Sequence, residues 1–297
     1  MGSIIELPMS IQQYLLKTFG HAISVDNLKG IKSEGGCLRV KFENNSVVIK
    51  NMKQNNEYIF YNECTKHLSY SEANIPKLYW SCYDENSYWI IIEDIPKSLP
   101  RFRWNGDLEI IEILQKLHSS QWGKGLPLEN YYKPKWDREM TEAVLNLFPD
   151  KLSKQFTELL YNIENKAQQL FYSYCWINGD TNPTNWGMKN DGTLVLFDWE
   201  RICLGSPAID LALIIPGLGT SDNYIETMIA EKYLNMWTKI PENFLFDKKD
   251  LLHNIKIAKL WSMVEFLANN SKDTNPKEIE YILENFQGKL YELYDLS

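Results

Sequence analysis

The sequence predicts an α+β fold of two lobes, in which a small N-terminal antiparallel β lobe with one helix precedes a larger, mostly helical C-terminal lobe. Short apolar runs separated by turn residues fill the N-terminal part, and longer segments with helical periodicity follow. Pro96 and Pro100 mark the change, so we place residues 1–95 in the first lobe and residues 96–297 in the second. A hydrophobic content of 44% and an aromatic content of 13% are typical of a packed globular protein.

Turn residues divide the first lobe into short strands. A Gly-Gly pair at residues 35–36 and an Asn-Asn pair at residues 44–45 separate apolar runs, as in an antiparallel meander. A helical segment precedes the first run, and another lies in the middle of the lobe. We expect helices over residues 9–19 and 55–68, and strands over residues 28–33, 37–42, 46–50, 77–81 and 88–93.

Helical patterns dominate the second lobe, where one short strand is expected at residues 193–197. Ligands commonly bind in the cleft beside a helical lobe, so we expect the ligand site there. The expected helices cover residues 109–121, 139–148, 154–171, 221–239, 248–269 and 277–294.

Composition excludes several classes of protein. A net charge of −8 argues against a nucleic-acid partner, because phosphates require a basic face, and it favours a cationic ligand slightly. No segment approaches the roughly 20 apolar residues that cross a bilayer, so we expect no membrane partner. The 5 cysteines are odd in number and scattered, which favours reduced thiols in a cytoplasmic protein, and the 4 histidines show no zinc-ligand spacing. Any metal ion is therefore expected to bind oxygen atoms.

Three oxygen-bearing side chains form the most informative pattern. Asn185 follows Asp180 by five residues, and Asp198 ends an apolar strand that comes after a turn at residues 190–192. Phosphoryl transfer needs a carboxylate that orients the attacking hydroxyl and oxygen atoms that hold Mg²⁺ against the phosphates. This trio supplies both. The alternative is that Asp180 and Asn185 only stabilise turns, as these residue types often do.

The same segment carries a family resemblance. Residues 176–185 read W-I-N-G-D-T-N-P-T-N and residues 194–200 read L-V-L-F-D-W-E. They closely resemble the H-G-D-x-x-x-x-N and I-D-W-E patterns of the aminoglycoside phosphotransferase and choline kinase family. Residues 205–212 are similar to the G-x-P-x-x-D-L-A stretch of that family, and residues 117–122 to its L-H-x-x-x-W stretch.

This resemblance implies a protein-kinase-like fold and a small-molecule kinase. ATP or GTP would be the co-substrate, Mg²⁺ the cofactor, and a hydroxyl group of a small molecule the acceptor. The protein would be a monomer or a homodimer. No G-x-x-x-x-G-K-[ST] motif exists in the chain, which excludes a P-loop nucleotide hydrolase.

The resemblance also implies roles for individual residues of the second lobe. Asp180 would be the catalytic base, and Asn185 and Asp198 the Mg²⁺ ligands. Asp210 would brace the catalytic loop, although an acid in the first turn of a helix is an equally good interpretation. Asn178 stands where the family has a histidine, and its amide is expected to support the loop by donating a similar hydrogen bond.

The first lobe is expected to bind the nucleotide phosphates. Residues 47–50, V-V-I-K, resemble the kinase V-A-I-K strand, which implies that Lys50 contacts the α- and β-phosphates. The following helix offers Glu57 and Glu63 as partners of Lys50, and Glu57 is preferred because residues 57–61 resemble the R-E-x-x-F-Y run of the family. The alternative is that Lys50 is a solvent-exposed residue at a strand end.

Two further segments are expected to contact the nucleotide. Gly35 and Gly36 lie in the loop that would cover the phosphates, although they match G-x-G-x-x-G poorly. The main-chain groups of Glu93, Asp94 and Ile95 would pair with the purine edge. An ordinary buried strand end explains the latter segment equally well.

The nature of the acceptor follows from a missing segment. Only 8 residues separate Asp198 from the helix expected at Pro207, which leaves no room for an activation segment and disfavours a protein substrate. An aminoglycoside, a choline-like amine or a sugar is expected instead. The alternative function is that of a catalytically impaired, nucleotide-binding pseudokinase that acts as a regulatory or interaction module. Side chains that could line an acceptor site are Glu226, Glu231, Glu265, Asp273, Trp261 and Phe266.

Overall fold

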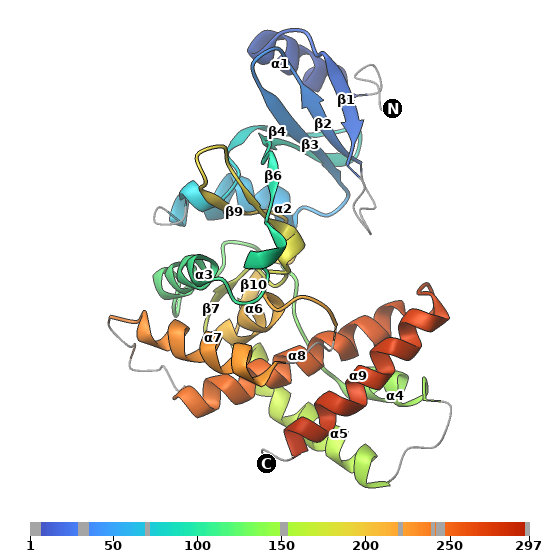
Figure 1. Ribbon diagram of the computed structural model, residues 1–297. Coiled ribbons are helices and arrows are strands. Elements are labelled where there is room, and N and C mark those ends of the chain that lie inside the picture. Colours follow the sequence, from blue (N-terminus) through green and yellow to red (C-terminus); the bar gives the residue numbers. More distant parts are fainter. Residues whose placement is uncertain are drawn as a thin grey trace. The chain divides into compact units, whose positions relative to one another are not determined.

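The computed structural model describes residues 7–28, 36–68, 72–148, 154–218, 222–238, 241 and 247–294, and the chain forms two compact units (Figure 1). The first unit comprises Met1–Ser98, Pro127–Asn130 and Gly187–Arg201. The second comprises Leu99–Leu126, Tyr131–Trp186 and Ile202–Ser297. The predicted α+β fold is confirmed, because an antiparallel sheet occupies the N-terminal part and helices dominate the rest. The lobe boundary after residue 95 stays a prediction.

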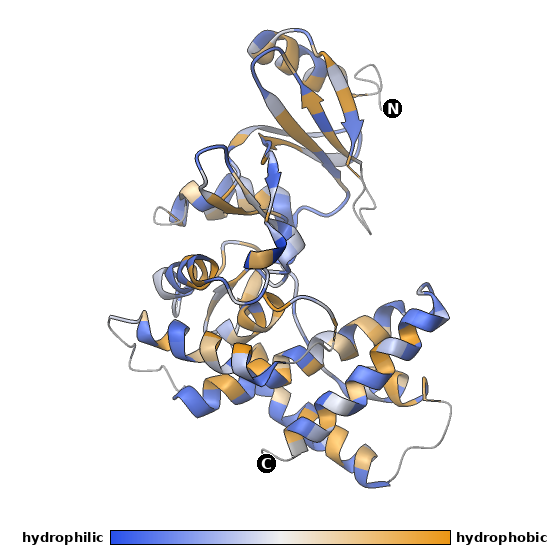
Figure 2. Cartoon of the chain, viewed as in Figure 1, coloured by the Kyte–Doolittle hydropathy of each residue, from blue (hydrophilic) through white to orange (hydrophobic). Residues whose placement is uncertain are grey.

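An antiparallel five-stranded sheet with the order β1-β2-β3-β5-β4 forms the core of the first unit. Helix α1 (Met9–Phe19) buries Ile11 and Leu15 against this sheet, in one cluster with Val40 and Val47. Figure 2 shows long parts of this sheet in orange, the colour of hydrophobic residues. The strands are β1 (Ser24–Asn27), β2 (Cys37–Lys41), β3 (Ser46–Met52), β4 (Leu78–Asp84) and β5 (Ser87–Glu93).

The first strand lies earlier in the chain than predicted. We expected it at residues 28–33, but β1 ends at Asn27, and residues 29–33 lie outside the described residues. Aspartate and asparagine disfavour strands by propensity. Here Asp26 pairs in register with Arg39 of β2 and lies 3.5 Å from the Lys41 ammonium, so cross-strand contacts outweigh that propensity.

The helix predicted at residues 55–68 is divided into three parts. Helix α2 (Asn56–Ile59) continues into a π-helical turn (Phe60–Cys64) and a 3₁₀ turn (Thr65–His67). The π-helical turn buries Phe60, Tyr61 and Cys64. A three-stranded sheet of β6 (Lys97–Ser98), β8 (Trp186–Met188) and β9 (Leu194–Leu196) was predicted only at β9.

The second unit is mostly helical, and α8 packs against α4, α5, α6, α7 and α9. A two-stranded antiparallel pair of β7 (Cys175–Ile177) and β10 (Cys203–Gly205) flanks residues 178–202 and was not predicted. Across the described ranges, no helix has the length and apolar character needed to cross a membrane. The helices are α3 (Leu108–Ser120), α4 (Arg138–Leu145), α5 (Lys154–Ala167), α6 (Pro207–Leu213), α7 (Asn223–Asn235), α8 (Lys248–Asn270) and α9 (Pro276–Tyr294).

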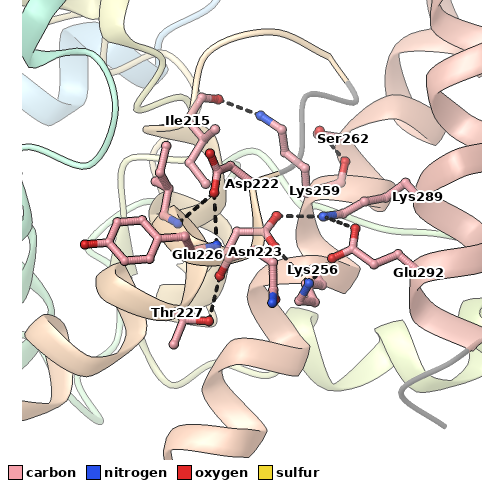
Figure 3. A network of polar contacts seen from close by, with 12 residues as sticks. Ile215, Asp222, Asn223, Glu226, Thr227, Lys256, Lys259, Ser262, Lys289 and Glu292 are labelled. Atoms are coloured by element: carbon pink, nitrogen blue, oxygen red, sulfur yellow. Dashed lines mark hydrogen bonds and ion pairs between the residues drawn. The ribbon is translucent and has the colours of Figure 1, made fainter.

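A buried cluster of charges joins α7, α8 and α9 (Figure 3). The Glu226 carboxylate lies 3.0 Å from the Lys256 ammonium and 2.6 Å from the Lys289 ammonium, and all three side chains are at most 1% exposed. Glu292 also contacts both lysines. The sequence suggested that Glu226 lines an acceptor site. Its carboxylate is instead neutralised by two lysines, because a buried acid requires opposite charges.

Lys259 lies beside this cluster and has a different partner. Its ammonium donates a hydrogen bond to the carbonyl of Ile215, just after the C-terminal end of α6, at 2.5 Å. A lysine at this place compensates the negative end of the helix dipole. Burial, followed by the positive charge of Lys289, nevertheless lowers the pKa of Lys259 from 10.5 to about 7.

Lys259→Met is expected to change how stability depends on pH. Because the folded protein binds this proton less tightly than the unfolded chain does, the wild-type free energy of unfolding falls as the pH is lowered from about 10 to about 7. Without the amine this contribution is absent, so the variant should gain roughly 1.4 kcal/mol per pH unit relative to wild type on lowering the pH through this range. Urea unfolding at several pH values measures the difference.

Lys249→Met, at an exposed lysine in the first turn of α8, serves as the control. Its stability relative to wild type should change little with pH. A difference between Lys259→Met and wild type that stays constant from pH 7 to about 10 would show that Lys259 binds its proton equally well in both states.

Candidate active site

The segment at residues 178–185 forms a tightly held loop in the second unit, directly after β7. Its first main-chain groups are fixed by Asp210, whose carboxylate accepts hydrogen bonds from the N–H groups of Asn178 at 2.9 Å and of Gly179 at 2.8 Å. Gly179 has a φ of 79°, a conformation that side chains other than glycine rarely adopt. A fixed carboxylate and a glycine therefore set the direction in which the chain enters Asp180.

Asp210 satisfies both of its predicted interpretations. It lies in the first turn of α6, which begins at Pro207 and is capped by the Ser206 hydroxyl. Its side chain is also fully buried and points back to the loop. A second contact comes from the Thr181 hydroxyl, which donates to the Asp210 carbonyl at 2.5 Å. Helix α6 thus holds the loop through side-chain and main-chain oxygens.

Asn178 supports the loop through a contact that the sequence did not indicate. Its Oδ1 accepts a hydrogen bond from the N–H of Asp180 at 2.9 Å, and the predicted donation by its amide stays a prediction. This is a local turn in which an asparagine side chain bonds the main chain two residues later. The side chain is fully buried. Asparagine therefore fixes the main chain of Asp180 from within the loop.

Asn185 lies beside Asp180. A 3₁₀ turn (Pro183–Asn185) brings its amide Nδ2 within 2.8 Å of the Asp180 carbonyl, to which it donates. The main chain of Asp180 is thus held on both sides, at its N–H and at its carbonyl. Asp180 is partly exposed. The side-chain amide of Asn185 donates through its Nδ2, and its Oδ1 is an acceptor.

Lys50, Glu57 and Asp198 form a second cluster, within the first unit. The Lys50 ammonium lies 2.8 Å and 2.7 Å from the two Glu57 oxygens and 3.0 Å from the Asp198 carboxylate. Burial alone lowers the pKa of Lys50, but the carboxylates of Glu57 and Asp198 outweigh it and raise that pKa above its ordinary value. Lys50 is therefore positively charged at neutral pH, and it is not the solvent-exposed lysine of the alternative interpretation.

The structure distinguishes between the two candidate partners of Lys50. Glu57 is 2% exposed and accepts from Lys50 with both oxygens. Glu63 is exposed and pairs with Lys66 at 2.8 Å. The N-terminal position of Glu57 in α2, before the π-helical turn, places it on the side of the helix that faces β3.

Asp198 has an unusual main-chain conformation, with a φ of 65°. Glu85 and Asn86 also have positive φ values, but they form the two-residue turn between β4 and β5, where such values are normal. Asp198 has no such explanation. Residues held in this region outside turns are often found at functional sites, where the surrounding structure maintains the strain.

The residue after Asp198 is held by contacts that the sequence did not indicate. The N–H of Trp199 donates to Glu57 at 3.4 Å, and its indole stacks on Phe60 with ring centroids 4.1 Å apart and planes at 8°. The same glutamate therefore binds Lys50 and the main chain next to Asp198. Phe60 was missed because an aromatic residue in a helix reads as an ordinary core residue.

The two expected nucleotide-contacting segments are described unequally. Gly35 lies outside the described residues, and the carbonyl of Gly36 accepts from Asn51 at 2.9 Å. A Cβ added at Gly36 would meet nothing within 4 Å, so space does not require a glycine there. The nucleotide contacts of both glycines stay a prediction.

The carboxylates at the end of β5 are already engaged. Glu93 lies 2.9 Å from Lys189, and Asp94 lies 2.9 Å from Arg39 and accepts from Ser46. The N–H of Glu93 is engaged as well and donates to the Lys77 carbonyl at 2.8 Å. The contact of the main chain of residues 93–95 with a purine stays a prediction.

Asn185 in the second unit and Asp198 in the first unit each carry an oxygen atom of a kind that Mg²⁺ binds. Mg²⁺ prefers carboxylate and amide oxygens together with water and phosphate oxygens. Asp198 offers a carboxylate that is 35% exposed, and Asn185 offers its amide oxygen. Within the described residues, no group of three or more His, Cys, Asp or Glu side chains is arranged for a metal ion.

Known proteins resemble this chain in sequence and in fold. The model of the phosphotransferase enzyme family matches residues 53–240 of the chain. Among solved structures, the chain is similar to a microcompartment-associated aminopropanol kinase, with 12% identity, a TM-score of 0.65 and coverage of 95% of both chains. It is also similar to a spectinomycin phosphotransferase in complex with ADP and spectinomycin, with 14% identity, a TM-score of 0.62 and coverage of 98% of this chain and 100% of that one.

A third similar structure is a choline kinase from Streptococcus pneumoniae, with 16% identity, a TM-score of 0.61 and coverage of 96% of this chain and 98% of that one. At such identities the likeness concerns the fold. It confirms the predicted protein-kinase-like fold of small-molecule kinases along nearly the whole chain.

Proposed function

Because the chain belongs to the phosphotransferase enzyme family, we propose that it transfers the γ-phosphate of ATP or GTP to a hydroxyl group of a small molecule, with Mg²⁺ as cofactor. The observation that carries this proposal is the loop around Asp180, in which one carboxylate is presented on a main chain fixed at its N–H and its carbonyl. Phosphoryl transfer depends mainly on positioning and electrostatics, and such a loop supplies positioning.

Asp180 is the proposed catalytic base. Its carboxylate accepts a hydrogen bond from the acceptor hydroxyl, aligns the hydroxyl oxygen with the γ-phosphate and takes up the proton as the new phosphate ester forms. Asn178 and Asp210 support the loop from inside the second unit. If the main chain of Asp180 moved, its carboxylate would lose its orientation toward the acceptor hydroxyl, so a rigid main chain favours the reaction.

Lys50 is the proposed contact to the α- and β-phosphates. Glu57 holds the ammonium with two short hydrogen bonds and keeps it charged. Gly35, Gly36 and the main chain of residues 93–95 are proposed to contact the rest of the nucleotide. Asn185 and Asp198 are the proposed Mg²⁺ ligands, and the ion when bound would neutralise charge on the phosphates.

A cationic or polyhydroxylated small molecule is the proposed acceptor. The net charge of −8 favours a cation. Similar folds belong to proteins described as an aminopropanol kinase, a choline kinase and a spectinomycin phosphotransferase. An aminoglycoside, a choline-like amine and a sugar are therefore the classes to test first. We further propose a cytoplasmic protein without a nucleic-acid or membrane partner, as a monomer or homodimer.

Nucleoside diphosphate release tests this function. Purified protein is incubated with Mg-ATP or Mg-GTP and with separate pools of aminoglycosides, amino alcohols and sugars. We expect one pool to raise diphosphate release at least about tenfold above the rate with water alone, and chelation of Mg²⁺ to remove the increase. Nucleotide binding without release in any pool would favour the pseudokinase alternative and contradict the proposed enzyme.

A further inference from the structure

A buried chain of hydrogen bonds extends from α7 to the loop of the second unit. The Tyr233 hydroxyl lies 3.1 Å from Nδ1 of His118, and Nε2 of His118 lies 3.1 Å from Oδ2 of Asp210. All three side chains are fully buried. Because Asp210 binds the N–H groups of Asn178 and Gly179, this series of hydrogen bonds ends at the backbone next to Asp180.

The donor and acceptor of each hydrogen bond in this series follow from the groups at its two ends, Asp210 and Tyr233. An ionised carboxylate only accepts hydrogen bonds, so Nε2 of His118 must carry the proton that points to Asp210. In a neutral imidazole Nδ1 is then an acceptor, which requires the Tyr233 hydroxyl to donate. Burial raises the pKa of Tyr233 well above its usual value, so this proton is retained.

Two sets of contacts fix α7, the helix that carries Tyr233. Two turns before Tyr233, Glu226 is bound by Lys256 and Lys289 in the charge cluster shown in Figure 3. Helix α7 also packs so closely against the turn before α3 that a Cβ at Gly106 would lie 2.9 Å from the side chain of Met228. The ring of Tyr233 also lies against that of His118, with centroids 5.8 Å apart.

We propose that Tyr233 is a positioning residue for the catalytic loop, in which its hydroxyl fixes the His118 tautomer that donates to Asp210. Asp210 then keeps both oxygens aligned with the N–H groups of Asn178 and Gly179. This inference rests on the proposed function, since the loop positions Asp180 for transfer. Tyr233 touches no reacting atom and acts only through His118.

Tyr233→Phe tests the proposal, because it removes one hydroxyl and keeps the ring packing. Loss of the donor leaves Nδ1 of His118 without a partner, so we expect kcat to fall about tenfold while the KM for the nucleotide changes less than about twofold. Tyr224→Phe is the matched control, at a tyrosine of the same helix that is 80% exposed, and it should keep wild-type kcat.

Nitrogen NMR of labelled histidine supplies a readout that does not depend on turnover, and its wild-type part does not depend on the folding of Tyr233→Phe. In the wild type we expect His118, assigned by the signal lost in His118→Asn, to show an unprotonated Nδ1 and a protonated Nε2. In Tyr233→Phe the two signals should move toward each other as the second tautomer becomes populated. Tyr224→Phe should leave them unchanged.

Two results would overturn the positioning role. One is a wild-type His118 that carries its proton on Nδ1, and the other is a Tyr233→Phe variant with wild-type kcat. Failure of the proposed function looks different, because wild-type protein would then release no diphosphate with any acceptor. In that case the positioning role falls with the function, although the nitrogen signals could still show the expected tautomer.

Discussion

Asp180→Asn is expected to lower kcat by about 10²–10⁴-fold, because an amide cannot take up the proton of the acceptor hydroxyl. The fold and the affinity for nucleotide should be retained. The contacts that shape this part of the loop involve the main chain of Asp180, through Asn178 and Asn185, and the substitution leaves them in place. Diphosphate release at saturating nucleotide and acceptor measures the effect.

Asp222→Asn is a matched control for this change. Asp222 is an exposed acid in the same unit, and it caps α7 through the N–H groups of Tyr224 and Ile225. Asparagine caps helices equally well, so kcat should stay within about twofold of wild type. Equal activity of Asp180→Asn and wild type would remove Asp180 from the role of base.

Asp198→Asn is expected to lower kcat by on the order of 10³-fold and to raise the Mg²⁺ concentration needed for half-maximal activity. A carboxylate that binds the ion contributes several kcal/mol to transition-state stabilisation, and an amide binds Mg²⁺ more weakly. Asparagine tolerates the φ of 65° at this position, so the substitution isolates the loss of charge from main-chain strain. Lys50 keeps its two bonds to Glu57.

Asp191→Asn provides the comparison within the same unit. Asp191 is exposed and accepts from the N–H of Thr193, a bond that an asparagine oxygen also accepts. Its Mg²⁺ dependence should match that of wild type. An Asp198→Asn enzyme with an unchanged Mg²⁺ dependence would place the metal ion on other ligands.

The sequence was informative where spacing along the chain determines geometry. The interval from Asp180 to Asn185 spans one turn, so the contact between them is local and could be expected from the motif. The preference for Glu57 over Glu63 rested on a local run of letters, and Glu57 is the residue that contacts Lys50. The long helices of the second unit were predicted to within four residues at each end.

Several contacts between distant segments could not be predicted. Tyr233 and His118 are separated by 115 positions, and the sequence around Tyr233 does not distinguish it from an aromatic residue of the core. Lys256 and Lys289 lie in helices in which a lysine is expected to be exposed, and only folding brings them to Glu226. The bond accepted by Asn178 depends on loop geometry that a motif comparison does not contain.

The short strands of the second half of the chain also depend on contacts that the sequence does not show. Only β9 was expected in the second half of the chain, although β7, β8, β9 and β10 all contain three residues and are too short for a usable alternation. Such strands form because partners exist, for example Cys203 opposite Ile177, and a partner is not visible in a three-residue window.

Transfer of labelled phosphate tests the central claim most directly. ATP labelled in its γ-phosphate is incubated with Mg²⁺, the protein and the acceptor pool that raises diphosphate release, and the products are separated. We predict one labelled phosphate ester of an acceptor hydroxyl for each diphosphate formed by wild-type protein, and almost no ester with Asp180→Asn. Label that appears only as free phosphate, or an ester formed equally well by Asp180→Asn, would contradict a small-molecule kinase with its base at Asp180.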